Sequence, residues 1–160
     1  RPIPLYARES VIDRLQSRFA YVFTGSKFYA AVAEAVELGT TMTLGEAELR
    51  FVDQPHGKIT SVGIRLDEGG RSAVYATDFN DMTDEMRALY QGSDVWICDC
   101  LMLKPHPTHA HLDAVLGWAR DLNVGQLFLT HLSNAMDYRS LIEQLPDWAA
   151  PAHDGLEIAL

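Results

Sequence analysis

The stretch that decides the fold is DVWICDC at residues 94–100. Its apolar side chains occupy both odd and even positions, which is typical of a strand buried on both faces of a parallel sheet. Helices are predicted on either side of it, over residues 83–90 and 112–122, and a further strand is predicted over residues 126–130. Because strands and helices alternate in this half of the chain, the sequence predicts a layered α/β protein.

The rest of the chain carries shorter periodic segments. Apolar residues at helical spacing predict a helix over residues 10–19, and an alanine-rich composition predicts another over residues 27–38. Two strands, over residues 60–66 and 72–77, are joined by the glycine-containing turn of a hairpin. The remaining expected elements are strands over residues 3–7, 48–52 and 155–160 and a helix over residues 137–145.

Composition limits the functions open to the chain. Its 160 residues are 48% hydrophobic, which suits one globular domain over residues 1–160, and no apolar run is long enough to span a bilayer. The 13 basic and 22 acidic residues give a formal net charge of −9, which argues against nucleic-acid binding by a broad basic surface. Cys98 and Cys100 occupy alternate strand positions, where a disulfide has poor geometry, so we expect reduced thiols and a cytoplasmic protein.

Ligand-type side chains follow the expected strands at several points. His56, Asp78 and His131 each come shortly after a strand, His109 lies in a loop rich in histidine and proline, and Asp154 precedes the last strand. Proteins of the α/β class place sites at the carboxyl ends of strands, and imidazole with carboxylate is a ligand set for zinc or manganese. Taken singly, each residue also fits a structural role, as an exposed histidine, a cap or a turn residue. The repetition of the pattern at three strand ends favours a metal site.

The order of several short motifs resembles a known family. They are PIPLY at 2–6, HG at 56–57 before the strand at 62–64, TD at 77–78, Asp99 with TH at 108–109, LTHLS at 129–133 and DGLEI at 154–158. In these motifs the chain resembles the C-terminal two-thirds of a metallo-β-lactamase-fold hydrolase. Within that family it looks most similar to the branch that contains the phosphoribosyl cyclic phosphodiesterase of phosphonate breakdown. The resemblance implies the corresponding part of an αββα four-layer sandwich.

The same resemblance assigns roles to four residues. His56 matches a ligand of the first metal, Asp78 matches the carboxylate that bridges both metals, and His131 matches the last ligand, on the second metal. His109 matches a histidine that faces the substrate phosphate and protonates the leaving oxygen, which makes it the expected catalytic residue. The implied cofactors are two divalent metals, zinc or manganese. The implied reaction is hydrolysis of a small cyclic phosphodiester by a metal-bound hydroxide.

One part of the family pattern is missing. The chief metal signature, His-x-His-x-Asp-His, belongs before the strand at residues 3–7, and the chain contains no such run. The nearest imitation, HAHLDA at 109–114, lacks the last histidine and is assigned to the substrate-facing position. We therefore expect the metal site to be partial or empty in this chain. The start at Arg1 without a methionine favours the loss of an N-terminal segment that carries the missing ligands.

Such a segment would also cover strands that are expected to be buried. Removing it should leave apolar surface exposed and a strand edge unpaired. We therefore expect that residues 1–160 are not a stable monomer on their own. That segment, a second chain or an intertwined oligomer such as a homodimer would supply the cover.

Two other classes of function stay open. Within the enzymes, the same fold performs ribonuclease and thioester-hydrolase reactions, and the acidic charge of the chain argues against the ribonuclease. Outside the enzymes, the alternative is a non-catalytic α/β interaction domain or subunit that has lost the metal site. A His-x-His-x-Asp-His run upstream of Arg1 would favour the hydrolase, whereas a natural start at Arg1 would favour the interaction domain.

Overall fold

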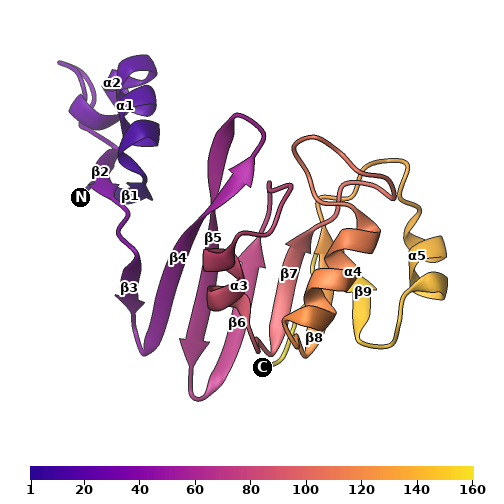
Figure 1. Ribbon diagram of the computed structural model, residues 1–160. Helices are drawn as coiled ribbons and strands as arrows, with labels where there is room; N and C mark the ends of the chain where they lie inside the picture. The colour runs from indigo at the N-terminus through magenta and orange to yellow at the C-terminus, as the bar shows by residue number, and fades with distance from the viewer. The chain divides into compact units, whose positions relative to one another are not determined.

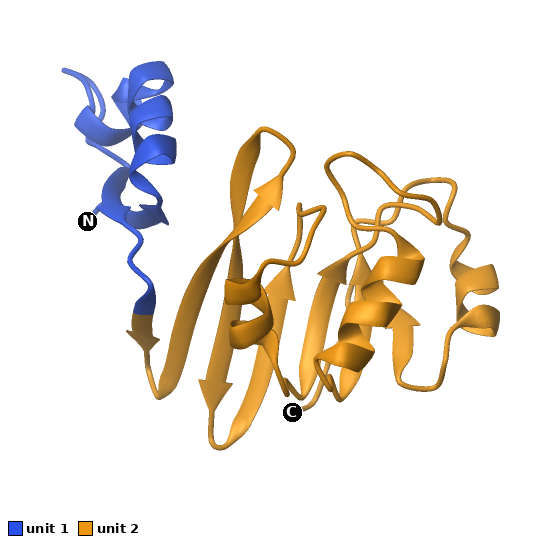
Figure 2. Cartoon of the chain, in the orientation of Figure 1, with its two compact units in different colours: residues 1–41 blue, residues 42–160 orange.

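The computed structural model describes all residues, 1–160 (Figure 1). The chain forms two compact units, residues 1–41 and residues 42–160 (Figure 2). The single domain expected over residues 1–160 stays a prediction. No helix of either unit is long and apolar enough to cross a membrane.

The first unit is built around two strands that pair in parallel. Its elements, in chain order, are β1 (Ile3–Ala7), α1 (Glu9–Arg18), α2 (Ala20–Thr24) and β2 (Ala33–Glu37). The helix predicted over residues 27–38 is wrong, because part of that segment forms β2. The backbone of β2 pairs along its whole length with β1, from Ile3 opposite Ala33 to Ala7 opposite Glu37. This long-range pairing overrides the helical propensity of the alanines.

The second unit is built around a seven-stranded sheet with the order β3-β4-β5-β6-β7-β8-β9. Its strands are β3 (Thr41–Leu44), β4 (Ala47–His56), β5 (Ile59–Glu68), β6 (Arg71–Ala76), β7 (Val95–Asp99), β8 (Gln126–Thr130) and β9 (Ala149–Pro151). Its helices are α3 (Asp84–Tyr90), α4 (Leu112–Asp121) and α5 (Tyr138–Gln144). The strands from β4 to β6 pair in antiparallel fashion, and those from β6 to β9 pair in parallel.

The predicted buried strand lies inside the parallel part of this sheet. Four of the five residues of β7 are buried, and β7 pairs with β6 on one side and β8 on the other. The core joins strand residues such as Val74, Trp96 and Leu127 to helix residues such as Met86 and Val115. Figure 1 shows α3 and α4 in front of the sheet. The mixed α/β fold predicted from residues 94–100 is therefore confirmed.

The C-terminal part of the sheet differs from the prediction. The strand predicted over residues 155–160 is absent, because the chain turns at Asp154 and Gly155 into a tail outside the sheet. The last strand is β9, only three residues long, and its sequence of two alanines and a proline gives no strand signal. The four-residue strand β3 is likewise too short to stand out in the sequence.

The four strands that precede the predicted site residues run in the same direction, which the short β9 also shares. Strands β4 and β6 both pair antiparallel with β5, so they run parallel to each other, and β7 and β8 continue in that direction. The carboxyl ends of these four strands therefore share one edge of the sheet. The residues predicted to form the metal site follow these ends, so the topology itself gathers them.

Candidate metal centre

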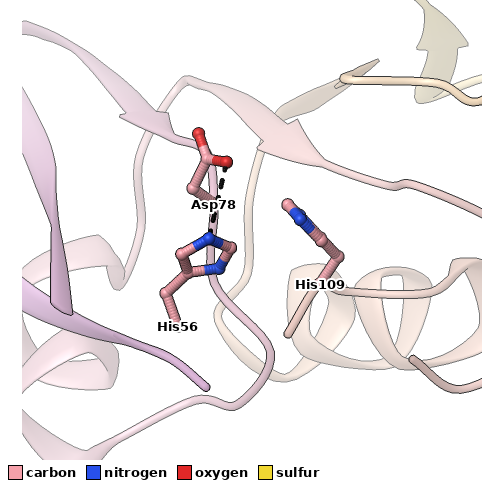
Figure 3. A group of neighbouring side chains, drawn as sticks. All are labelled: His56, Asp78 and His109. Carbon is pink, nitrogen blue, oxygen red and sulfur yellow. Dashed lines mark ion pairs between the residues drawn. The ribbon is translucent and has the colours of Figure 1, made fainter. Parts of the chain in front are cut away.

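Three ligand-type side chains meet at this edge (Figure 3). They are His56, the last residue of β4, Asp78, just after β6, and His109, in the loop between β7 and α4. Each offers one ligand atom, and these atoms all lie within 4.8 Å of one another. The structure thus brings together three of the four residues that the sequence assigns to the site.

The ring of His56 is held by the loop that carries His109. Its Nδ1 atom lies 2.7 Å from the carbonyl oxygen of Thr108. A carbonyl oxygen only accepts hydrogen bonds, so Nδ1 donates its proton and Nε2 is the nitrogen left to face the site. The Nε2 atom lies 3.9 Å from Oδ1 of Asp78. The next residue, Gly57, packs tightly against this loop, because a Cβ there would come within 2.6 Å of the Thr108 methyl group.

The ring of His109 is held by a buried carboxylate. Its Nδ1 atom lies 2.8 Å from Oδ2 of Asp99, the last residue of β7, and Asp99 is fully buried. The same Oδ2 accepts a hydrogen bond of 3.2 Å from the backbone N–H of Phe79, and Oδ1 has no partner. Because a carboxylate holds the Nδ1 side of the ring, Nε2 is the atom that His109 presents to the site.

Asp78 is directed into the site by its backbone. It adopts a φ of +59°, in the left-handed region that side-chain-bearing residues seldom occupy, at a cost of about 1–3 kcal/mol. Its carbonyl oxygen accepts a hydrogen bond of 2.8 Å from Ser61 Oγ. The following loop is tied to β4, since Asn80 N–H donates to Pro55 O at 3.0 Å and Asn80 Oδ1 accepts from Gly57 N–H at 3.1 Å. The surrounding structure therefore maintains the strained turn.

His131 lies beside the group of three. It directly follows β8, and it has the same left-handed φ of +59°. Its ring stacks on that of His109, with 4.8 Å between ring centroids and 14° between ring planes. The ligand group within 4.8 Å contains His109 and not His131. The assignment of His131 as a ligand and of His109 as the catalytic residue stays a prediction.

The neighbouring candidates have other positions. His106 lies near His109, with 5.4 Å between ring centroids, and its Nδ1 atom accepts from the backbone N–H of Thr108 at 3.3 Å. Thr83 caps α3 by accepting a hydrogen bond from the backbone N–H of Met86. Asp154 lies in the turn that the sequence predicts for it.

Asp99 is the functional residue that sequence reasoning left without a role. It belongs to one of the motifs shared with the family, but the motif alone does not indicate which residue it contacts. The sequence does contain a signal for the contact between Asp99 and a histidine. An acidic residue at the end of an otherwise buried strand needs a hydrogen-bonding or charged partner, and a histidine-rich loop follows it.

The donor set fits a divalent metal. Zinc binds imidazole nitrogen and carboxylate oxygen, and a catalytic zinc uses three protein ligands. In His56 and His109 the Nδ1 atom is occupied by a fixed acceptor, so each ring offers Nε2. The side chains of His56 and His109 are 18% and 13% exposed, whereas that of Asp78 is 42% exposed. The site is therefore sheltered on the imidazole side and open on the carboxylate side.

Comparison with known proteins places the chain in a family. A family model described as a beta-lactamase superfamily domain matches residues 1–132. A diphosphatase from the PhnP family superposes with a TM-score of 0.86 at 30% identity, over 100% of this chain and 59% of that chain. The metallo-beta-lactamase fold protein YhfI from Bacillus subtilis superposes with a TM-score of 0.77 at 18% identity, over 97% of this chain and 64% of that chain.

Among curated proteins, an octanoyltransferase from Porphyromonas gingivalis is 24% identical over 164 residues, which cover 98% of this chain and 32% of that protein. The chain thus spans 59% of the length of the diphosphatase and 32% of the length of the octanoyltransferase. The family model covers most of the chain, and the similar structures confirm the fold that the order of the motifs implies. The chain belongs to the beta-lactamase superfamily.

Proposed function

We propose that the protein carrying this chain is a metal-dependent hydrolase of phosphoric esters, with a small cyclic phosphodiester as its substrate. The observation that carries the proposal is the convergence of His56, Asp78 and His109, whose ligand atoms lie within 4.8 Å of one another. The similarity to a diphosphatase over the whole of this chain supports a phosphorus–oxygen bond as the bond that is broken. It also makes a diphosphate the second phosphorus substrate to test.

In this proposal His56, Asp78 and His131 hold the metal. A bound divalent metal, zinc or manganese, supplies Lewis acidity and lowers the pKa of coordinated water. Three protein ligands suffice for one such ion, and a second ion needs the ligands of the absent His-x-His-x-Asp-His signature. Because the chain has a formal net charge of −9, an anionic substrate depends on local positive charge at this edge of the sheet.

His109 acts as the general acid. Asp99 holds Nδ1 of the ring, so a proton on Nε2 faces the open side of the site. The protonated imidazole donates that proton to the oxygen whose bond to phosphorus breaks, so the ring of the cyclic substrate opens to a phosphomonoester with a free hydroxyl rather than an alkoxide. The hydrogen bond with Asp99 keeps the ring in a single orientation.

A second assignment of His109 makes a different prediction. One Nε2 atom cannot both bind a metal and donate a proton, and the ligand atom of His109 lies within the group of three. If His109 is the third ligand, then Asp99 acts as the carboxylate that orients a metal-binding imidazole. The two assignments differ in whether the metal stays bound when His109 is replaced.

An acyl substrate is the second candidate. The curated octanoyltransferase matches 98% of this chain, and transfer of an octanoyl group breaks and forms acyl bonds. Metal-assisted hydrolysis of an acyl thioester uses the same Lewis acidity as hydrolysis of a phosphodiester. An octanoyl thioester therefore belongs in the first substrate panel.

The experiment is a hydrolysis assay with matched metal analysis. The protein is loaded with zinc or manganese and given bis(p-nitrophenyl) phosphate, a five-membered cyclic ribose phosphate, a nucleoside diphosphate and an octanoyl thioester. We expect metal-dependent turnover of the phosphodiesters, which a chelator abolishes. Turnover of the thioester alone would move the assignment to the acyl candidate. A protein that binds metal but turns over none of the four would contradict the proposed phosphodiesterase.

A further inference from the structure

A buried glutamine lies on β4 close to the candidate metal centre. Gln54 is on β4, two residues before His56, and it is fully buried. Its Nε2 atom donates to Ser61 Oγ at 2.8 Å and to the carbonyl oxygen of Thr77 at 2.9 Å, and its Oε1 atom accepts from the Tyr90 hydroxyl at 2.8 Å. One side chain thus joins β5, the turn after β6 and helix α3.

One arm of this network reaches the backbone of Asp78. The hydroxyl of Ser61, which accepts from Gln54, lies 2.8 Å from the carbonyl oxygen of Asp78 and 3.2 Å from that of Thr77. Gln54 and Ser61 are also directly opposite each other in the pairing of β4 with β5. Two side chains therefore hold both carbonyl groups at the point where the chain enters its left-handed turn.

The other arm anchors the glutamine to helix α3. Tyr90 is fully buried, and burial raises the pKa of its hydroxyl far above the usual range, so the hydroxyl stays protonated and donates to Gln54. Gly63 leaves the space for this contact. A Cβ at that position would collide with the Tyr90 hydroxyl and lie 2.7 Å from Gln54 Oε1. The packing is therefore built around the hydrogen bond between Tyr90 and Gln54.

We infer that Gln54 and Ser61 are positioning residues for the metal carboxylate. They hold the Thr77 and Asp78 carbonyl groups so that the side chain of Asp78 points at His56. Neither residue belongs to the group of converging ligands, and both act through Asp78. This inference rests on the proposed metal site, and it adds that the affinity of the site for metal depends on a buried hydrogen-bond network close to it.

The test compares the two arms of the network. Ser61→Ala and Gln54→Leu remove the arm that reaches Asp78, whereas Tyr90→Phe removes only the anchoring hydroxyl. Zinc affinity is measured by competition with a chromophoric chelator, and thermal unfolding of each metal-free protein is measured in parallel.

We expect Ser61→Ala and Gln54→Leu to weaken zinc binding by about 10- to 100-fold, the usual effect of removing a residue that orients a metal ligand. We expect Tyr90→Phe to lower the unfolding temperature with less than about a threefold change in zinc affinity, because it leaves the bonds to Thr77 and Asp78 in place.

Ser61→Thr serves as the matched control, because it keeps the hydroxyl and should keep wild-type zinc affinity. If Gln54→Leu does not fold, the comparison of Ser61→Ala with Ser61→Thr still decides the test. Wild-type affinity in Ser61→Ala would overturn the inference while leaving the metal site intact. Equal weakening in Tyr90→Phe and Ser61→Ala would also overturn it, because the network would then act through general stability. Absence of zinc binding in the wild-type protein would instead refute the metal site on which the inference rests.

Discussion

The Nδ1 atom of His109 lies 2.8 Å from Oδ2 of Asp99, and Asp99 is fully buried at the end of β7. A carboxylate in the interior is costly unless it is paired, and the His109 ring together with the backbone N–H of Phe79 supplies its partners. The pair therefore fixes the orientation of the His109 ring. Any chemistry assigned to His109 depends on Asp99.

Asp99→Asn tests this dependence. Asparagine keeps the size of the side chain and can still accept a hydrogen bond, but it removes the negative charge beside the His109 ring. We expect kcat for phosphodiester hydrolysis to fall by about 10²-fold or more, with little change in bound metal. Turnover and metal content are measured on the same preparation. An unchanged kcat would show that the charge of Asp99 has no part in the reaction.

Replacement of His109 separates a proton donor from a ligand. If His109 is the general acid, His109→Ala should lower turnover by about 10²-fold or more while the metal content stays close to that of the wild type. The activity lost should also be smaller for a substrate with a nitrophenolate leaving group, which needs no proton. A parallel loss of metal and turnover would instead identify His109 as the third ligand.

Much of the second unit could be predicted from the sequence because its signals are local. The strand at residues 126–130 is found with the predicted bounds, and the helices after Thr83 and Asp137 begin with the side-chain caps that such residues form. The prediction of secondary structure fails where pairing with a distant strand decides whether a segment becomes a strand. Residues 33–37 carry a helical composition but pair with β1, and residues 155–160 have strand-like residues but no strand to pair with.

The candidate site shows the same division. His56, Asp78 and His109 could be found from the sequence, because they are ligand-type residues that follow strands. The carboxyl ends of parallel strands lie at one edge of the sheet, so residues that follow them come together there. The contacts of the buried residues that support them could not be found from the sequence. The partner of Asp99 lies ten positions away, and Gln54 and Tyr90 are separated by 36 positions. No periodicity or motif links residues whose contact arises only from sheet order and helix packing.

The two cysteines should be unreactive in the native protein. Both are free and buried, as the sequence predicts. Burial, and after it the charge of Asp99, raises the pKa of Cys100 to about 12, and burial raises the pKa of Cys98 well above its ordinary value. Because the thiolate is the reactive form, we expect slow labelling by a thiol reagent at pH 8 and rapid labelling of both cysteines in denaturant. Rapid labelling of the native protein at pH 8 would contradict the buried placement.

Residues 1–160 expressed alone should self-associate. In the first unit Leu38 is the only buried residue, whereas Ile3, Phe28 and Tyr29 are 72%, 82% and 78% exposed. Exposed apolar surface of this kind favours association with a second copy or with another segment. Sedimentation velocity at several concentrations measures the association. A monomer that unfolds in one cooperative thermal transition would contradict this expectation and would strengthen the case for a non-catalytic domain.

The most direct test of the account is zinc binding by the wild-type protein, Asp78→Asn and Asp154→Asn, measured by equilibrium dialysis and elemental analysis. Asp154 lies in a surface turn outside the group of three, so its variant controls for the loss of one carboxylate. We predict that the wild type and Asp154→Asn bind zinc equally and that Asp78→Asn loses it, because Asp78 is the carboxylate among the converging ligands. Equal zinc binding by all three proteins, or none by the wild type, would contradict the claim that this edge of the sheet is a metal site.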